Sequence, residues 1–461
     1  MIRYHARWII PIADRPFEHG TLVVDEANGG RIAFVGPRAL APRGRDHDLG
    51  HVVLMPGLVN AHCHLELTTM RGFLEDLEFR RWIVRLIGAR GAVLDRDALL
   101  DSARLGLEEG IRAGITTYAD TGDSGVVATA MREYGVRGIM YQEVFGPDPS
   151  QCGAAMADLK EKVARHMAEA TPLVRVGVSP HAPYTVSDGL FRAATTFARE
   201  ADLPMAIHIA ESAIESRLVV HADGPFADAL RARGFAVAPR AASPVQLLAN
   251  LDVLAARPLL IHCVRVDAHD LSTIANARCA IAHCPISNAK LGHGIAPLFE
   301  IQSAGITVGL GSDSVASNNR MDLIEEARVA LLMQRARIDS HKVPTAMQVL
   351  ELATIGGARS LGLSAVVGSL EVGKSADLAA FPLDESVPVQ DPVDTVIHAL
   401  GGTPASFVAV AGVPLVVDGR RVGSSAGLAS RVQRHADALR DWLAADEKAA
   451  GFFDRRPPGG H

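Results

Sequence analysis

Eight apolar, β-branched runs alternate with helix-like segments along the middle of the chain. Segments such as 97–113 and 187–201 separate consecutive runs. Repeated strand–helix alternation predicts parallel strands, and eight repeats are the number that closes a barrel. We therefore expect an α/β fold, with a (β/α)8 TIM barrel as the catalytic domain over residues 55–368. The runs expected to form its strands are 53–61, 115–119, 138–145, 173–179, 204–208, 259–263, 280–283 and 306–311.

Short strands with turn signals flank this middle region on both sides. Residues 21–24 and 31–35 enclose an Asn28-Gly29-Gly30 turn, and residues 376–381 and 406–422 again have the pattern of strands. These regions are expected to pair into one small β-sandwich domain built from both termini, residues 1–54 and 369–425. A charged C-terminal helical tail, 426–461, follows and ends in Pro457-Pro458-Gly459-Gly460.

The composition argues against several classes of function. A net charge of −6, from 46 basic and 52 acidic residues, is not typical of proteins that bind nucleic acid or anionic membranes. The five cysteines form no CxxC pair, which favours a reducing, cytoplasmic compartment. The N-terminus lacks a signal-peptide pattern, and no uncharged apolar stretch of about 18 residues predicts a membrane span.

Histidines lie at the carboxyl ends of the expected strands. His62 and His64 follow the first run, and both imidazoles can point at one ion because residues two apart in a strand face the same side. His208 closes the fifth run, His262 lies at the end of the sixth, and Asp313 follows the eighth. Barrel active sites are built at this end, and imidazoles with a carboxylate suit Zn²⁺. The pattern therefore predicts a metal site.

The sequence resembles the amidohydrolase superfamily in these same segments. Residues 56–64, Pro-Gly-Leu-Val-Asn-Ala-His-Cys-His, look like its opening signature, and His208-Ile209-Ala210-Glu211 matches its HxxE element. Residues 262–264 and 311–319 match the next two motifs, and the resemblance extends to 373–378. It implies a metal-dependent hydrolase of the deaminase and chlorohydrolase branch, the triazine-hydrolase-like group.

The resemblance implies one metal ion in place of two. Binuclear amidohydrolases usually carry a carbamylated lysine at the end of the fourth strand, whereas this chain has Ser179-Pro180-His181 there. A single divalent ion would then be held by His62, His64, His208 and Asp313. Zn²⁺ is favoured, and the ligand types also admit Fe²⁺ or Mn²⁺.

The resemblance also implies the catalytic residues. A divalent metal lowers the pKa of bound water to about 7, which provides a nucleophile at neutral pH. Asp313 would accept a proton from that water, and His262 would hydrogen-bond the attacking oxygen. Glu211 would carry a proton to a ring nitrogen of the substrate, after which ammonia leaves. From its position alone, Glu211 could equally be a carboxylate that opens a helix, where the dipole favours negative charge.

Members of this branch act on aminated heterocycles, and several segments narrow the expected substrate to a purine nucleoside. Residues 64–67, 143–146 and 284–291 are similar to aminodeoxyfutalosine deaminases, so 6-amino-6-deoxyfutalosine of the menaquinone route is the leading candidate. Enzymes that deaminate S-adenosylhomocysteine and methylthioadenosine have a ribose-binding glutamate where this chain has Gly91. The residues expected to contact the substrate are His181, Ser317, Arg71, Trp82 and Glu66.

Other interpretations stay open. Within the fold, the alternatives are deamination of S-adenosylhomocysteine, methylthioadenosine or guanine, and hydrolysis of a chlorinated triazine. Outside catalysis, a metal-free scaffold of the same fold would bind partners, but such proteins typically lose metal ligands that this chain keeps. The expected partners are a small-molecule substrate and, in a homodimer, a second copy of the chain.

Overall fold

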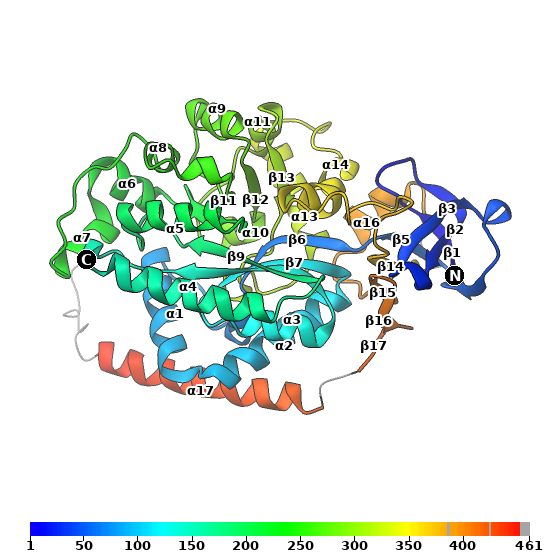
Figure 1. Cartoon of the computed structure of the whole chain (residues 1–461), viewed down its shortest axis with the longest axis horizontal. Helices are drawn as coiled ribbons and strands as arrows, with labels where there is room; N and C mark the ends of the chain where they lie inside the picture. Colours follow the sequence, from blue (N-terminus) through cyan, green and yellow to red (C-terminus); the bar gives the residue numbers. More distant parts are fainter. Residues whose placement is uncertain (385–387, 424–425, 452–461) are drawn as a thin grey trace, which may run out of the picture.

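The computed structural model describes residues 1–384, 388–423 and 426–451. Its strands form a barrel and, beside it, a small β domain that contains the N-terminus (Figure 1). Helices of the middle region surround the barrel, and a long C-terminal helix lies along one side of them (Figure 1). The architecture is the predicted α/β barrel with a small domain assembled from both ends of the chain.

Eight parallel strands make up the barrel. They form two four-stranded sheets, in the orders β6-β7-β8-β9 and β10-β11-β12-β13. Single bridges close the circle, one between Val178 and Met205 and the other between Cys63 and Asp313. In chain order the strands are β6 (Leu58–Cys63), β7 (Ile115–Gly122), β8 (Arg137–Val144), β9 (Val174–Pro180), β10 (Ala206–Ile209), β11 (Leu259–His262), β12 (Ala280–His283) and β13 (Thr307–Leu310).

Helices cover the outside of the barrel, and polar side chains set where several of them begin. Asp95 and Ser212 accept hydrogen bonds from backbone N–H groups in the first turns of α2 and α6, and Asp267 does so in a capping box before α9. Because helices cover one side of the strands and the barrel interior the other, β6, β7 and β8 are buried along their whole length.

The helices have the following bounds. The longer ones are α1 (Phe79–Val93), α2 (Arg96–Arg112), α3 (Val126–Tyr134), α4 (Cys152–Ala168), α5 (Asp188–Glu200), α6 (Ala213–His221), α7 (Gly224–Ala232), α8 (Pro244–Asn250), α9 (Ala268–Ala277), α13 (Leu323–Arg337), α16 (Pro392–Ala399) and α17 (Leu428–Gly451). The short ones are α10 (Pro285–Lys290), α11 (Leu298–Ser303), α12 (Val315–Asn318), α14 (Ala346–Glu351), α15 (Gly357–Ser360), η1 (Glu26–Asn28), η2 (Arg38–Leu40), η3 (Leu65–Met70), η4 (Pro149–Gln151), η5 (Val253–Ala256) and the π-helical η6 (Leu352–Gly356).

The β domain is a mixed sheet that takes strands from both ends of the chain. β5 pairs with β1 on one side and with β14 on the other, so N-terminal and C-terminal strands share one sheet. The sheet has a core of its own, in which Tyr4, Leu54 and Phe407 are buried. In chain order its strands are β1 (Ile2–Ile9), β2 (Phe17–Asp25), β3 (Arg31–Pro37), β4 (Arg45–Asp48), β5 (Val52–Pro56), β14 (Leu378–Pro382), β15 (Phe407–Val410), β16 (Val413–Val417) and β17 (Arg420–Arg421).

The first apolar run is two strands, and the prediction of a single strand over 53–61 was wrong. β5 ends at Pro56 in the β domain, whereas β6 begins in the barrel. Gly57 forms the corner, where its N–H donates to the carbonyl of Asp377 and a Cβ would lie 2.2 Å from Thr116 Oγ1. The local pattern misses this break because the pairing partners, which differ on the two sides of Gly57, decide where each strand ends.

The C-terminal helix α17 packs against the barrel helices α1 and α2. Arg431 forms an ion pair with Asp101 of α2, with 2.7 Å between Nε and Oδ2. The predicted helical tail is thus helical from Leu428 to Gly451. Its last residues, Pro457-Pro458-Gly459-Gly460, lie outside the described part of the chain.

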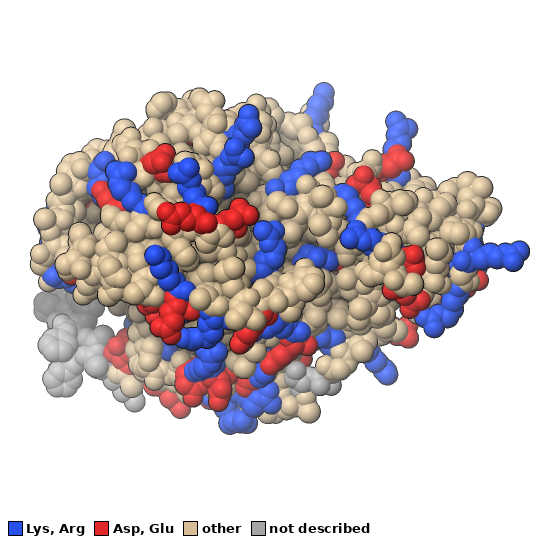
Figure 2. All heavy atoms as spheres, viewed as in Figure 1, with Lys and Arg blue, Asp and Glu red and all other residues tan. Residues whose placement is uncertain are grey.

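The surface carries charges of both signs. On the face seen in Figure 2, acidic and basic side chains are interspersed over the barrel helices and the β domain. Within the described residues, no helix is both long and apolar enough to cross a bilayer. All five cysteines are free thiols, and four of them are buried as small apolar side chains.

A buried ion pair joins the barrel to the β domain. Arg137, at the start of β8, donates from Nε to Asp377 Oδ2 at 2.8 Å and from a terminal nitrogen to Ser375 Oγ at 2.9 Å. Asp377 also accepts the backbone N–H of Ala411. Both charged side chains are nearly free of solvent contact, so the loss of either one leaves the other as a buried, unpaired charge.

Replacing Asp377 with alanine is therefore expected to lower the free energy of unfolding by about 3–5 kcal/mol. The midpoint of thermal unfolding measures this loss. Glu161→Ala is the matched control, because its ion pair with Arg165 is exposed and contributes less than about 1 kcal/mol. Equal midpoints for the two variants would contradict the structural role assigned to the buried pair.

Candidate metal centre and active site

Two histidines project from the end of β6 into the mouth of the barrel. His62 lies in the strand and His64 follows it directly, with their ring centroids 4.8 Å apart and their planes nearly perpendicular. The side chain of His62 is 1% exposed and that of His64 is 14% exposed. The two-residue spacing thus places both imidazoles on one side of the strand, as the sequence predicts.

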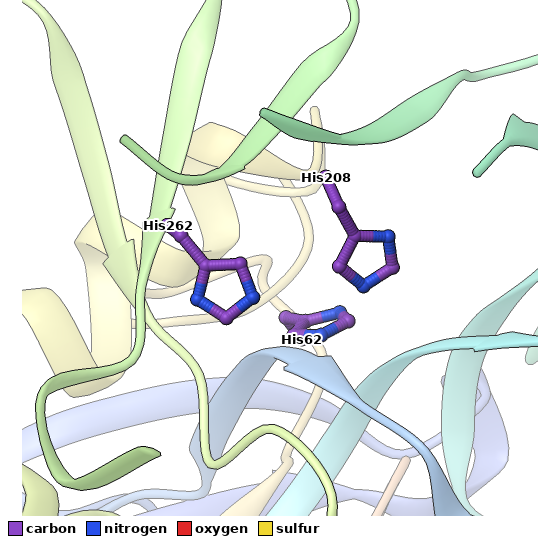
Figure 3. A group of neighbouring side chains, drawn as sticks. All are labelled: His62, His208 and His262. Carbon is purple, nitrogen blue, oxygen red and sulfur yellow. The ribbon is translucent and has the colours of Figure 1, made fainter. Parts of the chain in front are cut away.

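Three other barrel segments bring donor groups to the same place. His208 on β10 and His262 at the end of β11 point toward His62, as Figure 3 shows. The Nε2 atoms of His208 and His64 are 3.3 Å apart. Asp313, which follows β13, has Oδ1 at 3.2 Å from His62 Nε2 and at 3.6 Å from His64 Nε2. The structure therefore gathers the four predicted metal ligands in one buried cluster.

The electrostatics of this cluster suit a divalent cation. Burial lowers the pKa of His62, His64 and His208, that of His64 to about 3, so the rings are in the neutral form that binds metal. Burial opposes ionisation of Asp313, but the hydrogen bond from His62 outweighs it and holds the pKa of Asp313 well below its usual range. His62 Nδ1 is buried without a partner. Three nitrogens and one carboxylate are a donor set that Zn²⁺ accepts.

The backbone around the cluster adopts left-handed conformations at residues that carry side chains. Such conformations cost of order 1–3 kcal/mol each and persist where the surrounding structure enforces them. At one of them the enforcing group is Glu215, whose carboxylate accepts the N–H of Ala210 at 2.9 Å and that of Glu211 at 2.8 Å. The residues concerned, with their φ angles, are Ala210 (51°), His262 (76°), Cys263 (47°) and Asp313 (56°).

Glu211 and His262 lie side by side at the edge of the cluster. Glu211 Oε1 is 3.7 Å from His262 Nε2, and both side chains are almost fully buried. His262 is held from its other side, because its Nδ1 hydrogen-bonds the side-chain oxygen of Asn288 at 3.0 Å. A buried carboxylate and an oriented imidazole thus stand next to the proposed metal ligands.

Two of the residues predicted to contact the substrate border the ligands. The ring of His181 lies 4.8 Å from that of His208, and its Nδ1 is 2.8 Å from Thr185 Oγ1. Ser317 donates from Oγ to the Oδ2 atom of Asp313 at 3.0 Å. Both are in place to meet a molecule bound at the cluster, and their contact with substrate stays a prediction.

Trp82 belongs to an aromatic group beside the cluster. It is buried on α1 and stacks on Phe79, with 6.3 Å between ring centroids. Phe79 in turn meets the ring of His293 edge-on at 4.4 Å, and Phe226 of α7 lies 6.2 Å away. Residues of α1 and α7 therefore cover one side of the site.

The structure places the other two predicted contact residues in ion pairs. Glu66 is buried and accepts a hydrogen bond from Arg90 at 2.7 Å. Arg71 is half-exposed and pairs with Glu109. It lines a surface cavity of about 370 Å³ that contains none of the clustered histidines. The described contacts of Arg71 therefore do not bring it to the cluster.

Four residues near the cluster were not assigned roles from sequence. Glu215 and Asn288 fix the backbone of Glu211 and the ring of His262, and His293 touches Glu211. Glu143, at the end of β8, is buried and has a carboxylate oxygen within 4.8 Å of ring nitrogens of His181 and His208. The position of Glu143 at the carboxyl end of a strand could have marked it as a candidate site residue. The other three lie on helices or in a loop, where no sequence pattern marks a residue as part of the site.

Comparison with known proteins places most of the chain in one family. The model of the amidohydrolase family matches residues 53–422. A protein of Desulforudis audaxviator named 5-methylthioadenosine/S-adenosylhomocysteine deaminase is 32% identical over 422 residues, which cover 90% of this chain and 93% of that protein.

Two solved structures resemble the structure of this protein over nearly the whole chain. An adenosine deaminase from Xanthomonas campestris with bound zinc has a TM-score of 0.83 at 28% identity, covering 95% of this chain and 98% of that one. The atrazine chlorohydrolase TrzN from Arthrobacter aurescens, complexed with zinc, has a TM-score of 0.79 at 26% identity, covering 95% and 100%. Both of these proteins hold zinc, and both share the fold of this chain.

Replacing His64 or Asp313 with alanine is expected to weaken metal binding by more than about 100-fold. Residues that only orient a ligand typically contribute 10–100-fold, and these two would contact the ion itself. Elemental analysis after dialysis against buffered zinc measures the retained metal. His166→Ala is the control, because His166 is buried on α4 away from the cluster.

Removal of the metal from the unaltered protein provides the complementary measurement. Chelation is expected to lower the thermal midpoint, because a ligand that binds only the folded state stabilises it. A preparation that carries no metal and is indifferent to chelator would point to the metal-free scaffold.

Proposed function

The chain belongs to the amidohydrolase family, and we propose that it is a deaminase of adenine nucleosides that uses one divalent metal ion, Zn²⁺ as the first choice. The family and its relatives establish the coarser activity, hydrolytic deamination. The proposal adds the nucleoside class, the metal and the residues that act.

One observation carries the proposal. Donors from β6, β10 and the loop after β13 meet in a single buried cluster, with Glu211 and His262 beside it. Hydrolysis at a carbon of an aromatic ring needs an activated water and a proton source on the ring. A metal ion held by the cluster would activate the water, and Glu211 would transfer the proton to the ring.

The roles of the side chains follow from their surroundings. A divalent metal, when bound, acts as a Lewis acid that lowers the pKa of water to about 7. Asp313 is held ionised by His62, so it can accept a proton from the attacking water. His262, oriented by Asn288, can hydrogen-bond the oxygen that develops negative charge at the attacked carbon.

Glu211, which is ionised, takes one proton from the attacking water and passes it to the ring. Protonation of the ring nitrogen next to the amino-bearing carbon makes that carbon more electrophilic and lets the tetrahedral intermediate form. Asp313 takes the second proton of the water and passes it to the amino group, which leaves as ammonia while the ring keeps the oxygen as a carbonyl. Burial of both carboxylates excludes bulk water from these transfers.

The sugar end of the substrate distinguishes the candidate nucleosides. The relative named above supports methylthioadenosine or S-adenosylhomocysteine. Gly91, which stands where those enzymes have a ribose-binding glutamate, lies on the exposed side of α1, with nothing within 4 Å of a Cβ built there. The missing carboxylate, together with the similarity of 64–67, 143–146 and 284–291, favours 6-amino-6-deoxyfutalosine as the leading substrate.

The proposal is tested by ammonia release from metal-reconstituted protein. The compounds are 6-amino-6-deoxyfutalosine, methylthioadenosine, S-adenosylhomocysteine, adenosine, guanine and a chlorinated triazine. Turnover is expected to be fastest with one of the adenine nucleosides. Release from guanine alone, or chloride release from the triazine, would replace the nucleoside assignment, and no turnover of any compound would overturn it.

Glu211→Gln is expected to keep its metal and to lower kcat by about 10²–10⁴-fold, because the amide cannot shuttle a proton. Zinc content and the rate with the best substrate are measured on one preparation. The matched control is Glu161→Gln on the exposed face of α4, which should turn over normally. Undiminished turnover in Glu211→Gln would remove this residue from the mechanism.

A further inference from the structure

The segment after α10 brings a second histidine, besides His262, against the carboxylate of Glu211. His293 has a side chain that is 4% exposed, and its Nε2 lies 3.2 Å from Glu211 Oε1. We infer that His293 is a positioning residue that fixes the carboxylate of Glu211 for proton transfer to the substrate ring. This inference rests on the role that the proposed function gives to Glu211.

The loop is built to hold His293 in this place. Gly292 and Gly294 flank it with φ angles of 70° and 106°, which glycine adopts far more readily than other residues. The backbone N–H of His293 donates to the carbonyl of Asn288 at 2.9 Å. Phe79 closes the other side, with its ring edge-on to the imidazole at 4.4 Å. The ring is therefore confined between its own loop and α1.

The short segment from Asn288 to His293 contacts both side chains proposed to flank the substrate, His262 and Glu211. Asn288, on α10, holds the ring of His262, and His293, three residues past the end of that helix, reaches Glu211. Because one backbone unit carries both partners, the distance between the two catalytic side chains is set by a single rigid turn. Placing a proton donor to within a fraction of an ångström requires support of this kind.

The contact leaves one carboxylate oxygen for chemistry. Within the described residues, the two histidine contacts of Glu211 both fall on Oε1, from His262 at 3.7 Å and from His293 at 3.2 Å. The N–H of His293 is not aligned for a linear hydrogen bond, and such bonds commonly tighten when substrate binds. Burial alone would raise the pKa of Glu211, but the neighbouring side chains of His262 and His293 outweigh it and lower that pKa. Glu211 is therefore ionised and ready to receive a proton.

The test compares two substitutions of His293. His293→Leu removes the donor at similar volume, whereas His293→Gln keeps an N–H of similar reach. With the best substrate of the screen, His293→Leu is expected to lower kcat by about 10- to 100-fold, the range for a hydrogen bond to a charged group. Its KM should change by less than about threefold, since only proton transfer is impaired. His293→Gln should recover most of the rate.

A double-variant cycle shows whether His293 acts through Glu211. In the Glu211→Gln background, His293→Leu is expected to have no further effect on kcat, because the carboxylate it positions is gone. Multiplicative losses would overturn the inference, and so would a rise in KM with unchanged kcat. His166→Leu, the same change at a buried histidine of α4, is the control for packing damage.

Crystal structures of the zinc-loaded proteins give a readout that does not depend on turnover. The Glu211 carboxylate should keep one position in the unaltered protein and in His293→Gln and rotate away in His293→Leu, while all three retain zinc. An unmoved carboxylate in His293→Leu would overturn the inference even if the protein deaminates nucleosides. A protein that turns over none of the compounds yet shows this rotation would refute the proposed function and leave the positioning contact standing.

Discussion

Neutral imidazoles and one ionised carboxylate share a space at the barrel mouth from which water is nearly excluded. Without a cation, the facing nitrogens of His64 and His208, 3.3 Å apart, would gain little from their proximity. Burial keeps the rings unprotonated, and the same burial makes a bound cation the strongest available partner for Asp313. The strand ends, the left-handed turns and the closing bridge between Cys63 and Asp313 all hold these donors together.

The residues around the donors show how the fold maintains that arrangement. Glu215 holds two N–H groups of the turn after β10, and Asn288 and His293 reach across from the segment around α10. None of these three is a predicted metal ligand. They restrain the backbone or the side chains of Glu211 and His262, the two groups proposed to act beside the metal ligands. The precise placement of these two groups therefore depends on residues that the local sequence pattern does not mark.

The contrast between the donors at strand ends and the residues that restrain them explains which parts of the fold and the site could be predicted from the sequence. The strands and the donors at their ends follow from periodicity and from the rule that barrel sites form at carboxyl ends, and the structure places His62, His64, His208 and Asp313 together. The break at Gly57 depends on which strand pairs on each side of it. The position of His293 depends on two flanking glycines and on Phe79, which lies more than two hundred residues earlier in the chain. Contacts between distant segments leave no local pattern to detect.

We expect the choice of substrate to depend on residues other than those that act on the reacting ring. In the proposed mechanism the donors, Glu211 and His262 act on the ring that is attacked, so they would serve any aminated heterocycle and would not distinguish one sugar from another. Selectivity must then come from the cover formed by α1 and α7, where Phe79, Trp82 and Phe226 pack together. Gly91 also lies on α1, but on its exposed side, with nothing within 4 Å of a Cβ built there. Under the proposed function, we therefore expect substitutions in α1 and α7 to alter the choice of nucleoside and to spare the proposed metal ligands.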